Sequence, residues 1–347
     1  MKHGIEELKL INRDLTKTNA EFFARVQELE SLLENKSPSK EFAPELQHET
    51  DKLFQFDCCE IVCDGKDEEE WLQHRSSGVG ASEVADAIGH GWGSSVRLWG
   101  VKLGLIEPFA GNEKTEWGLL LEPLIAQRLL EDEDFKKEYG SGWILYKNTA
   151  MYRSKVYSHQ FCTPDFFLVK GDKIINVQIK ATGWLDFSEK LPKHVWLQVQ
   201  DEMFVTGLDE TIVAAFSGKD LKLYWHHVKY QHDIMQIICK DVEAFWQKVQ
   251  TKEQPEPDAS QDCTEALNEL YPPDEEETEI ALPSHLSEVH DELTKIAEQE
   301  KEIKDRKTAL KNKVLSELKT NQRGTLPQGG GFTYKPNKNG KRTLRRF

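Results

Sequence analysis

The sequence predicts an α/β fold, because helical and strand patterns alternate through the central part of the chain. The helical patterns place apolar side chains on one face, whereas the strand patterns are short and rich in Ile, Val and Phe. The expected helices are 80–88, 116–131 and 196–205, and the expected strands are 166–169 and 174–180. Lys170, Gly171 and Asp172 join the two strands, which indicates a hairpin.

The chain of 347 residues is longer than one hydrophobic core usually holds, so we expect one main domain with additional segments. Hydrophobic residues make up 38% of the sequence and nine Trp are present, which is enough for a substantial core. The expected parts are an amphipathic N-terminal helix and linker at 1–50, the main domain at 51–250, an acidic disordered linker at 251–284, and a C-terminal helix with a basic tail at 285–347.

Charge is distributed unevenly along the chain, although the net charge is -15. Residues 253–279 contain eleven acids and no Lys or Arg, whereas residues 301–347 contain fourteen bases and three acids. The acidic, proline-containing segment is too polar to pack, and we interpret it as disordered. The basic end is suited to contact DNA phosphates or a partner, and a solvated tail is an equally good interpretation.

No stretch of the sequence has the ~20 apolar residues that a membrane span needs, and residues 1–19 lack the apolar core of a signal peptide. We therefore expect a soluble, cytoplasmic protein with no membrane partner. The six cysteines have no paired CxxC spacing. A zinc site or a disulfide framework is therefore not expected.

Two flanking segments have heptad patterns of apolar residues. Residues 5–35 predict a helix that forms a short coiled coil or lies on the main domain, and residues 285–319 predict a second helix. The heptad positions are Leu8, Leu15, Phe22 and Leu29 in the first segment and Val289, Ile296, Ile303 and Leu310 in the second. Residues 332–347 predict a small hairpin that turns at Asn339 and Gly340.

The strand at 174–180 carries the residues that suggest chemistry. Side chains alternate between the two faces of a strand, so Ile179 points to the core while Gln178 and Lys180 share the opposite face. Asp165 follows Pro164 immediately before the partner strand of this hairpin. An amide and a lysine are therefore expected to project beside a carboxylate.

These side chains are suited to hold a hard divalent ion for phosphodiester hydrolysis. Asp165 offers a carboxylate, Gln178 an amide oxygen and Ile179 a backbone carbonyl, while Lys180 can orient the attacking water or stabilise the transition state. Glu122, an acid on the otherwise apolar helix at 116–131, completes the set; because Leu121, Leu124 and Ile125 suggest burial, we expect a cation or donor near it. The alternatives are a solvated face for Glu122 and an ordinary exposed hairpin for Asp165 to Lys180.

Five blocks in register resemble the lambda exonuclease and YqaJ-like viral recombinase family of the PD-(D/E)xK nuclease superfamily. They are an R-x(6)-S block at 75–84, a WG-x(3)-E helix at 117–122, a TPD element at 163–165, a QIK strand at 178–180, and a QVQ-x(2)-M-x-VTG helix at 198–207. The resemblance covers residues 71–249. It implies a restriction-endonuclease-like core, in which helices flank a central mixed sheet.

The resemblance also implies a function and partners. Members of the family resect double-stranded DNA ends in the 5′-to-3′ direction with Mg²⁺, for which Mn²⁺ can substitute, and pass the exposed strand to an annealing protein. The implied location is the host-cell cytoplasm if the protein is phage-encoded. Processive relatives often close into a ring around DNA, so a homo-oligomer is possible, but the heptads could equally join two chains.

The residue roles follow from the resemblance. The implied metal ligands are Glu122, Asp165, Gln178 and the Ile179 carbonyl; Lys180 is the catalytic lysine, Gln198 is a supporting amide, and Arg75 and Ser82 bind a DNA phosphate. The family usually has glutamate at position 178, so this chain has two carboxylates instead of three, which is expected to weaken metal binding. A DNA-end-binding scaffold without catalysis and an endonuclease with the same core are the alternative functions.

Overall fold

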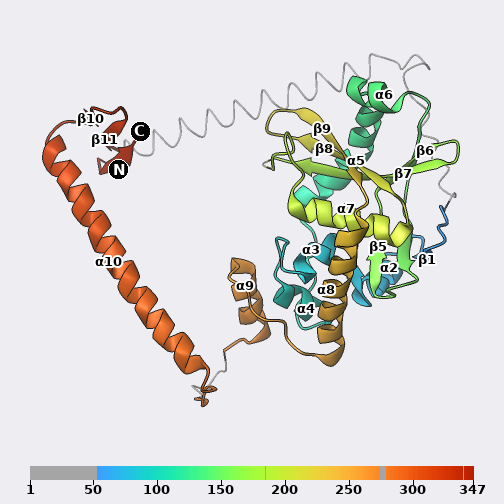
Figure 1. Cartoon of the computed structure of the whole chain (residues 1–347), viewed down its shortest axis with the longest axis horizontal. Helices are drawn as coiled ribbons and strands as arrows, with labels where there is room; N and C mark the ends of the chain where they lie inside the picture. The colour runs from blue at the N-terminus through green and yellow to red at the C-terminus, as the bar shows by residue number, and fades with distance from the viewer. Residues whose placement is uncertain (1–52, 184, 274–278, 339) are drawn as a thin grey trace, which may run out of the picture. The chain divides into compact units, whose positions relative to one another are not determined.

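Two sheets and the surrounding helices form the first of two units in the computed structural model of the chain, which describes residues 53–183, 185–273, 279–338 and 340–347 (Figure 1). Among the described residues, the first unit ends at Pro272 and the second begins at Pro273. The helix expected at 5–35 lies outside the described residues.

The larger sheet of the first unit has five strands in the order β3-β6-β7-β8-β9. Their bounds are Ile144–Lys147 (β3), Phe166–Lys170 (β6), Lys173–Thr182 (β7), Glu210–Ser217 (β8) and Lys222–Lys229 (β9). β7 and β8 pair in parallel and the other neighbours pair antiparallel, so the sheet is mixed. The two strands and the hairpin predicted from residues 166–180 are confirmed.

Helices α5 (Glu113–Glu131) and α7 (Lys193–Thr206) cover opposite faces of this sheet. Ile175, Val177 and Ile179 of β7 pack with α5. α7 is the crossover between β7 and β8, because parallel neighbours cannot be joined by a tight turn. The order α5, β6–β7 hairpin, α7 and β8 confirms the α/β class and the central mixed sheet flanked by helices.

Local sequence explains the ends of both helices. The Asn112 side chain accepts hydrogen bonds from the backbone N–H groups of Lys114 and Thr115, which caps the start of α5. α7 ends at Gly207, whose φ of 73° lies in the left-handed region that favours glycine. α7 is buried on nearly all sides, so polar residues that it carries lie inside the protein.

A smaller sheet with the order β1-β4-β5-β2 lies in the same unit. Its strands are Cys59–Cys63 (β1), Met151–Ser154 (β4), Gln160–Cys162 (β5) and Val79–Gly80 (β2). Further helices of the described residues in this unit are Glu68–Ser76 (α2), the short 3₁₀ helix Ala81–Glu83 (η1), Val84–Ala87 (α3), Ser95–Lys102 (α4), Glu133–Tyr139 (α6), which packs with α5 and the larger sheet, and His232–Thr251 (α8). The helix predicted at 80–88 is therefore confirmed as η1 followed by α3.

The prediction of disorder for 251–284 is wrong for one part of that segment. Residues Gln261–Leu270 form helix α9, which Ser260 caps by accepting from the Cys263 N–H. Cys263 and Ala266 are buried against α4, and Arg97 of α4 pairs with two acids of α9, Asp262 at 2.6 Å and Glu269 at 2.9 Å. The helix has a narrow apolar face that the acidic composition of the segment did not reveal. Ion pairs between its acids and Arg97 stabilise the helix.

The second unit consists of helix α10 and a three-stranded antiparallel sheet. Their bounds are Leu286–Leu318 (α10), Arg323–Thr325 (β10), Gly331–Pro336 (β11) and Arg342–Arg346 (β12). The predicted C-terminal helix and hairpin are confirmed, and β10 is an additional strand. Among the described residues, none of the helices combines the length and apolar character that crossing a membrane requires.

Candidate active site

The carboxylate of Asp165 is held by the strand that follows it. Its Oδ2 accepts hydrogen bonds from the Ile179 backbone N–H at 2.7 Å and from the Gln178 side-chain Nε2 at 2.6 Å. The pairing of Phe166 with Val177 fixes this register. The hairpin thus brings the predicted acid and amide into contact.

Gln178 has an unsatisfied oxygen at this position. Its side chain is buried, its NH₂ group donates to Asp165, and its Oε1 has no hydrogen-bond partner in the described part of the chain. Leaving a buried acceptor unpaired costs about 1–3 kcal/mol, and a hard cation is a natural partner for an amide oxygen. Asp165 and Gln178 therefore fit a divalent ion as ligands.

The donor set is poor in negative charge. Within the residues that the structure describes, no group of three or more His, Cys, Asp or Glu side chains is placed to hold a metal ion. This agrees with the glutamine at position 178, because an ion here has two predicted carboxylates, Asp165 and Glu122. An amide and the Ile179 carbonyl must supply the other protein oxygens.

Glu122 is paired with a lysine that the sequence did not suggest. The side chain is 17% exposed, and Lys147 Nζ of β3 lies 2.5 Å from its Oε2. Lys147 also lies 4.6 Å from the ring centroid of Phe166, next to Asp165. The expected cation near Glu122 is present, and a solvated face for Glu122 is not observed.

The helix around Glu122 is more exposed than predicted. Ile125 is buried and Leu121 is half-buried as expected, but Leu124 is 61% exposed, and Trp117 and Leu120 also face outward. The prediction of burial for Leu124 is therefore wrong. Part of the apolar surface of α5 lines a groove instead of packing in the core.

Lys180 and Gln198 lie together on the face of the sheet that α7 covers. Lys180 Nζ donates to Gln198 Oε1 at 3.0 Å, and Gln198 Nε2 donates to Glu202 Oε1 at 2.8 Å. The amide orientation of Gln198 is thus fixed by an acceptor on one side and a cation on the other. The structure thus brings the predicted Lys180 and Gln198 into contact.

Glu202 is a neighbour of the candidate site that sequence reasoning missed. It is fully buried, it accepts from Gln198 and from Asn176 Nδ2 at 2.7 Å, and burial together with the nearby Asp165 raises its pKa to about 8. Its neighbour Asp201 is also buried and accepts from Gln160 at 2.6 Å. The sequence signal that could have indicated these buried acids is that Asp201 and Glu202 lie between two apolar stretches of the α7 sequence.

Burial also shifts the pKa of Asp165. It raises the pKa to about 6, with Lys180 and Lys147 opposing the shift and Glu122 adding to it. The nearby cations and hydrogen-bond donors do not offset the free-energy cost of burying the charged forms of Asp165 and Glu202. Additional positive charge at this site favours ionisation of both.

Arg75 and Ser82 lie on two segments that Glu83 connects. Arg75 Nε donates to Glu83 Oε1 at 3.0 Å, and Lys102 Nζ lies 2.7 Å from Glu83 Oε2. Because a guanidinium has five N–H donors, Arg75 retains donors for a phosphate. Ser82 is exposed on η1, and η1 packs against α7, which carries Gln198.

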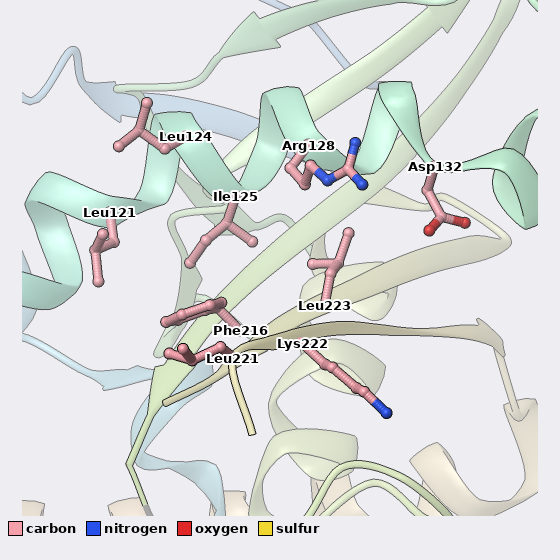
Figure 2. A pocket seen from close by; sticks show the side chains of 9 residues that line it. All are labelled: Leu121, Leu124, Ile125, Arg128, Asp132, Phe216, Leu221, Lys222 and Leu223. Carbon is pink, nitrogen blue, oxygen red and sulfur yellow. The ribbon is translucent and has the colours of Figure 1, made fainter. Parts of the chain in front are cut away.

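A separate pocket of about 490 Å³ lies on the opposite face of the sheet, beside α5 (Figure 2). Figure 2 shows Leu121, Leu124 and Ile125 of α5 above Phe216 and Leu223, with Arg128, Asp132 and Lys222 at the polar end. None of the predicted site residues lines this pocket. The predicted active site therefore does not coincide with it.

The family model of the YqaJ-like viral recombinase domain matches residues 70–209. No curated protein matches the chain. Among solved structures, the chain is similar to an alkaline exonuclease from Laribacter hongkongensis, at 18% identity over 53% of this chain and 94% of that one, with a TM-score of 0.42. The dAMP complex of that exonuclease gives a TM-score of 0.43 at the same identity and coverage.

A phage-related exonuclease from Haemophilus somnus 129PT is similar at 14% identity over 50% of this chain and 94% of that one, with a TM-score of 0.39. The matched residues 70–209 contain the five sequence blocks and Glu122, Asp165, Gln178, Lys180 and Gln198. The resemblance predicted from the sequence is confirmed: this part of the chain is similar to the YqaJ-like viral recombinase domain.

Proposed function

We propose that this chain is a Mg²⁺-dependent deoxyribonuclease that removes nucleotides from the ends of double-stranded DNA. The observation that carries the proposal is the presence of two hydrogen-bonded pairs, Asp165 with Gln178 and Lys180 with Gln198, together with the unsatisfied Gln178 oxygen. This set lies within the segment that matches the recombinase family.

Each residue has a distinct task in this proposal. Asp165, Gln178, Glu122 and the Ile179 carbonyl hold the ion, which when bound lowers the pKa of a water and neutralises the phosphate. Lys180, held by its hydrogen bond to Gln198, orients the water or stabilises the charge that develops on the phosphoryl oxygens.

Substrate positioning is assigned to a second group. Arg75, fixed at its Nε by Glu83, presents its remaining N–H groups to a DNA phosphate, and the exposed hydroxyl of Ser82 donates to the same phosphate. Glu122 would offer the ion the carboxylate oxygen that is not paired with Lys147, because an ionised carboxylate accepts at both oxygens.

Polarity and partners are proposed from the resemblance that the sequence blocks carry. We propose digestion in the 5′-to-3′ direction, transfer of the exposed strand to a single-strand annealing protein, and action in the cytoplasm as a homo-oligomer around the duplex. Mn²⁺ is expected to replace Mg²⁺, because both ions accept carboxylate and carbonyl oxygens.

The test is hydrolysis of a linear duplex labelled at its 5′ or 3′ ends, with Mg²⁺ or EDTA. Asp165→Ala and Lys180→Ala are each expected to abolish Mg²⁺-dependent loss of duplex. The matched controls Asp172→Ala, in the β6–β7 turn, and Lys222→Ala, at the start of β9, are expected to retain it, because both side chains are exposed and outside the site. Full activity in either site variant would exclude this mechanism.

A non-catalytic DNA-end-binding scaffold is the second candidate, which the glutamine at position 178 favours. Binding of duplex ends without release of mononucleotides, in Mg²⁺ or Mn²⁺, would support the scaffold. Cutting of closed circular DNA would instead indicate an endonuclease with the same core.

A further inference from the structure

The sheet of the second unit has one strongly basic face. In its register Arg323 of β10 pairs with Thr333 of β11, and Thr333 pairs with Arg345 of β12. In the next row Lys335 pairs with Thr343. Because partners in register share a face, three cations and two hydroxyls project from the same side of the sheet.

An exposed aromatic ring belongs to this side. The guanidinium of Arg323 lies 4.2 Å from the ring centroid of Phe347, which is 49% exposed. We call Arg323, Thr333, Lys335, Thr343 and Arg345, together with Phe347, the basic sheet face. Hydroxyls and cations are the groups that bind phosphate oxygens in protein–DNA complexes.

The opposite side of the sheet has a structural role. Leu318 of α10 is buried, and a Cβ atom at Gly324 would lie only 2.8 Å from its Cδ2. Arg342 belongs to this side: it stacks 4.0 Å from the Tyr334 ring centroid and donates to the backbone oxygens of Tyr334 and Asn321. The hydrogen bonds and ring contact of the Arg342 guanidinium thus stabilise the packing of the sheet against the end of α10.

Arg323 also stacks on an aromatic ring, that of Phe347, but the cations of the basic sheet face have no acidic partner among the described residues. No ion pair involves Arg323, Lys335 or Arg345 within the described residues, and the sequence contains no Asp or Glu after Glu317. Each of these cations lies opposite a threonine in the register, so the three positive charges gather on one face without a neighbouring carboxylate to neutralise them. The arrangement is suited to bind a polyanion.

We propose that the basic sheet face binds the phosphate backbone of DNA, as a second contact that holds the substrate independently of the active site. The identity of the polyanion as DNA rests on the proposed function. Arg323 and Arg345 lie two strand spacings apart, roughly 10 Å, so the face spans more than one phosphate of a duplex. The contact is independent of base sequence, because it uses charges and hydroxyls without reading base edges.

The test measures binding of the full chain to a labelled 40-base-pair duplex in EDTA, over a range of KCl concentrations. The triple variant Arg323→Gln, Lys335→Gln, Arg345→Gln is expected to lower the slope of log affinity against log salt by about 2 to 3, near 0.9 for each phosphate that the protein no longer neutralises. At low salt, the affinity of the triple variant for the duplex is expected to fall by about tenfold or more. The matched control Lys301→Gln, Lys304→Gln, Lys311→Gln removes the same charge from exposed positions of α10 and is expected to keep the original slope.

Several outcomes decide the proposal. An unchanged slope in the triple variant, or an equal decrease in the control, would overturn it. If the Gln variant misfolds, Arg323→Lys with Arg345→Lys keeps the charge, and its slope must match that of the parent chain. Unchanged DNA binding combined with lost binding of a poly-glutamate probe would assign the face to an acidic protein instead.

This assay contains no hydrolysis step. A chain without nuclease activity can therefore still show the predicted salt dependence, and the two proposals fail separately.

Discussion

Two groups of buried carboxyls in the first unit differ in how their charge is compensated. Glu83 accepts from Lys102, Arg75 and the Gly80 backbone N–H, and although burial opposes this, the two cations lower its pKa. Asp165 accepts from an amide and a backbone N–H, and burial raises its pKa to about 6.

This difference in charge compensation distinguishes a carboxylate with a structural role from one that is suited to bind a cation. The Glu83 cluster is complete without any added group, so it holds α2, η1 and α4 together. The Asp165 group, with Glu202 behind it, lacks positive charge at its centre. In the proposed function a bound cation would complete this second group, and four predictions test that contrast.

The largest effect is expected at Lys102, whose side chain is only 2% exposed. Lys102→Met removes the principal partner of Glu83 and leaves a buried charge, so the free energy of unfolding should fall by about 3–5 kcal/mol in urea denaturation. Lys240→Met on the exposed side of α8 is the control, with a change within about 0.5 kcal/mol. Equal stability of the two variants would contradict the structural role of the Glu83 cluster.

The second prediction concerns pH in the absence of divalent ions. The folded-state pKa values of Asp165, about 6, and Glu202, about 8, lie above their ordinary values. Their contribution to stability is therefore present in full below the ordinary pKa and is lost as pH rises through 6 and 8. The melting temperature in EDTA should fall by several degrees between pH 5 and pH 8.5.

Glu202→Gln separates the two groups. It removes the carboxyl with the higher pKa, so the variant should lose less stability between pH 7 and pH 8.5 than the parent chain. An identical decrease in both proteins would show that Glu202 does not titrate in this range.

The third prediction is stabilisation by Mg²⁺ at pH 8, measured as a thermal shift. Binding to the folded state alone adds about 1–3 kcal/mol at ion concentrations well above the dissociation constant. Asp165→Asn should abolish the shift, whereas Asp172→Asn in the exposed β6–β7 turn should retain it. A shift that persists in Asp165→Asn would place the ion elsewhere.

The smallest effect is expected from Gln178→Glu, which restores a third carboxylate. The Mg²⁺ concentration for half-maximal thermal shift should fall several-fold, because a charged ligand replaces a neutral one. Without Mg²⁺ the same variant should be less stable at pH 8 than the parent chain, since it buries another acid. Loss of Mg²⁺ binding in this variant would mean that the neutral amide is required.

The strand pattern predicted much of the site, because alternation along β7 is a local property. It placed Gln178 and Lys180 together beside Asp165, and the structure agrees. The sequence blocks added Gln198, which bonds to Lys180. These contacts join residues close in the chain or in a recognised motif.

The contacts that were not predicted depend on tertiary packing. Lys147 contacts Glu122 because β3 pairs with β6. The spacing of residues in the sequence does not predict this strand pairing. Glu202 is buried because α7 is covered on several sides, and α9 folds because Arg97 partners its acids. Composition averages and single-helix patterns do not contain this information.

The crossover connection through α7 has a consequence for synthesis on the ribosome. The β6–β7 hairpin can form early, because its strands are adjacent in the chain. Gln198 and the parallel partner β8 emerge later, and closing such a crossover is the slower event. A nascent chain that ends before α7 therefore lacks the amide that orients Lys180, so the lysine is not positioned until the crossover has been synthesised and has docked.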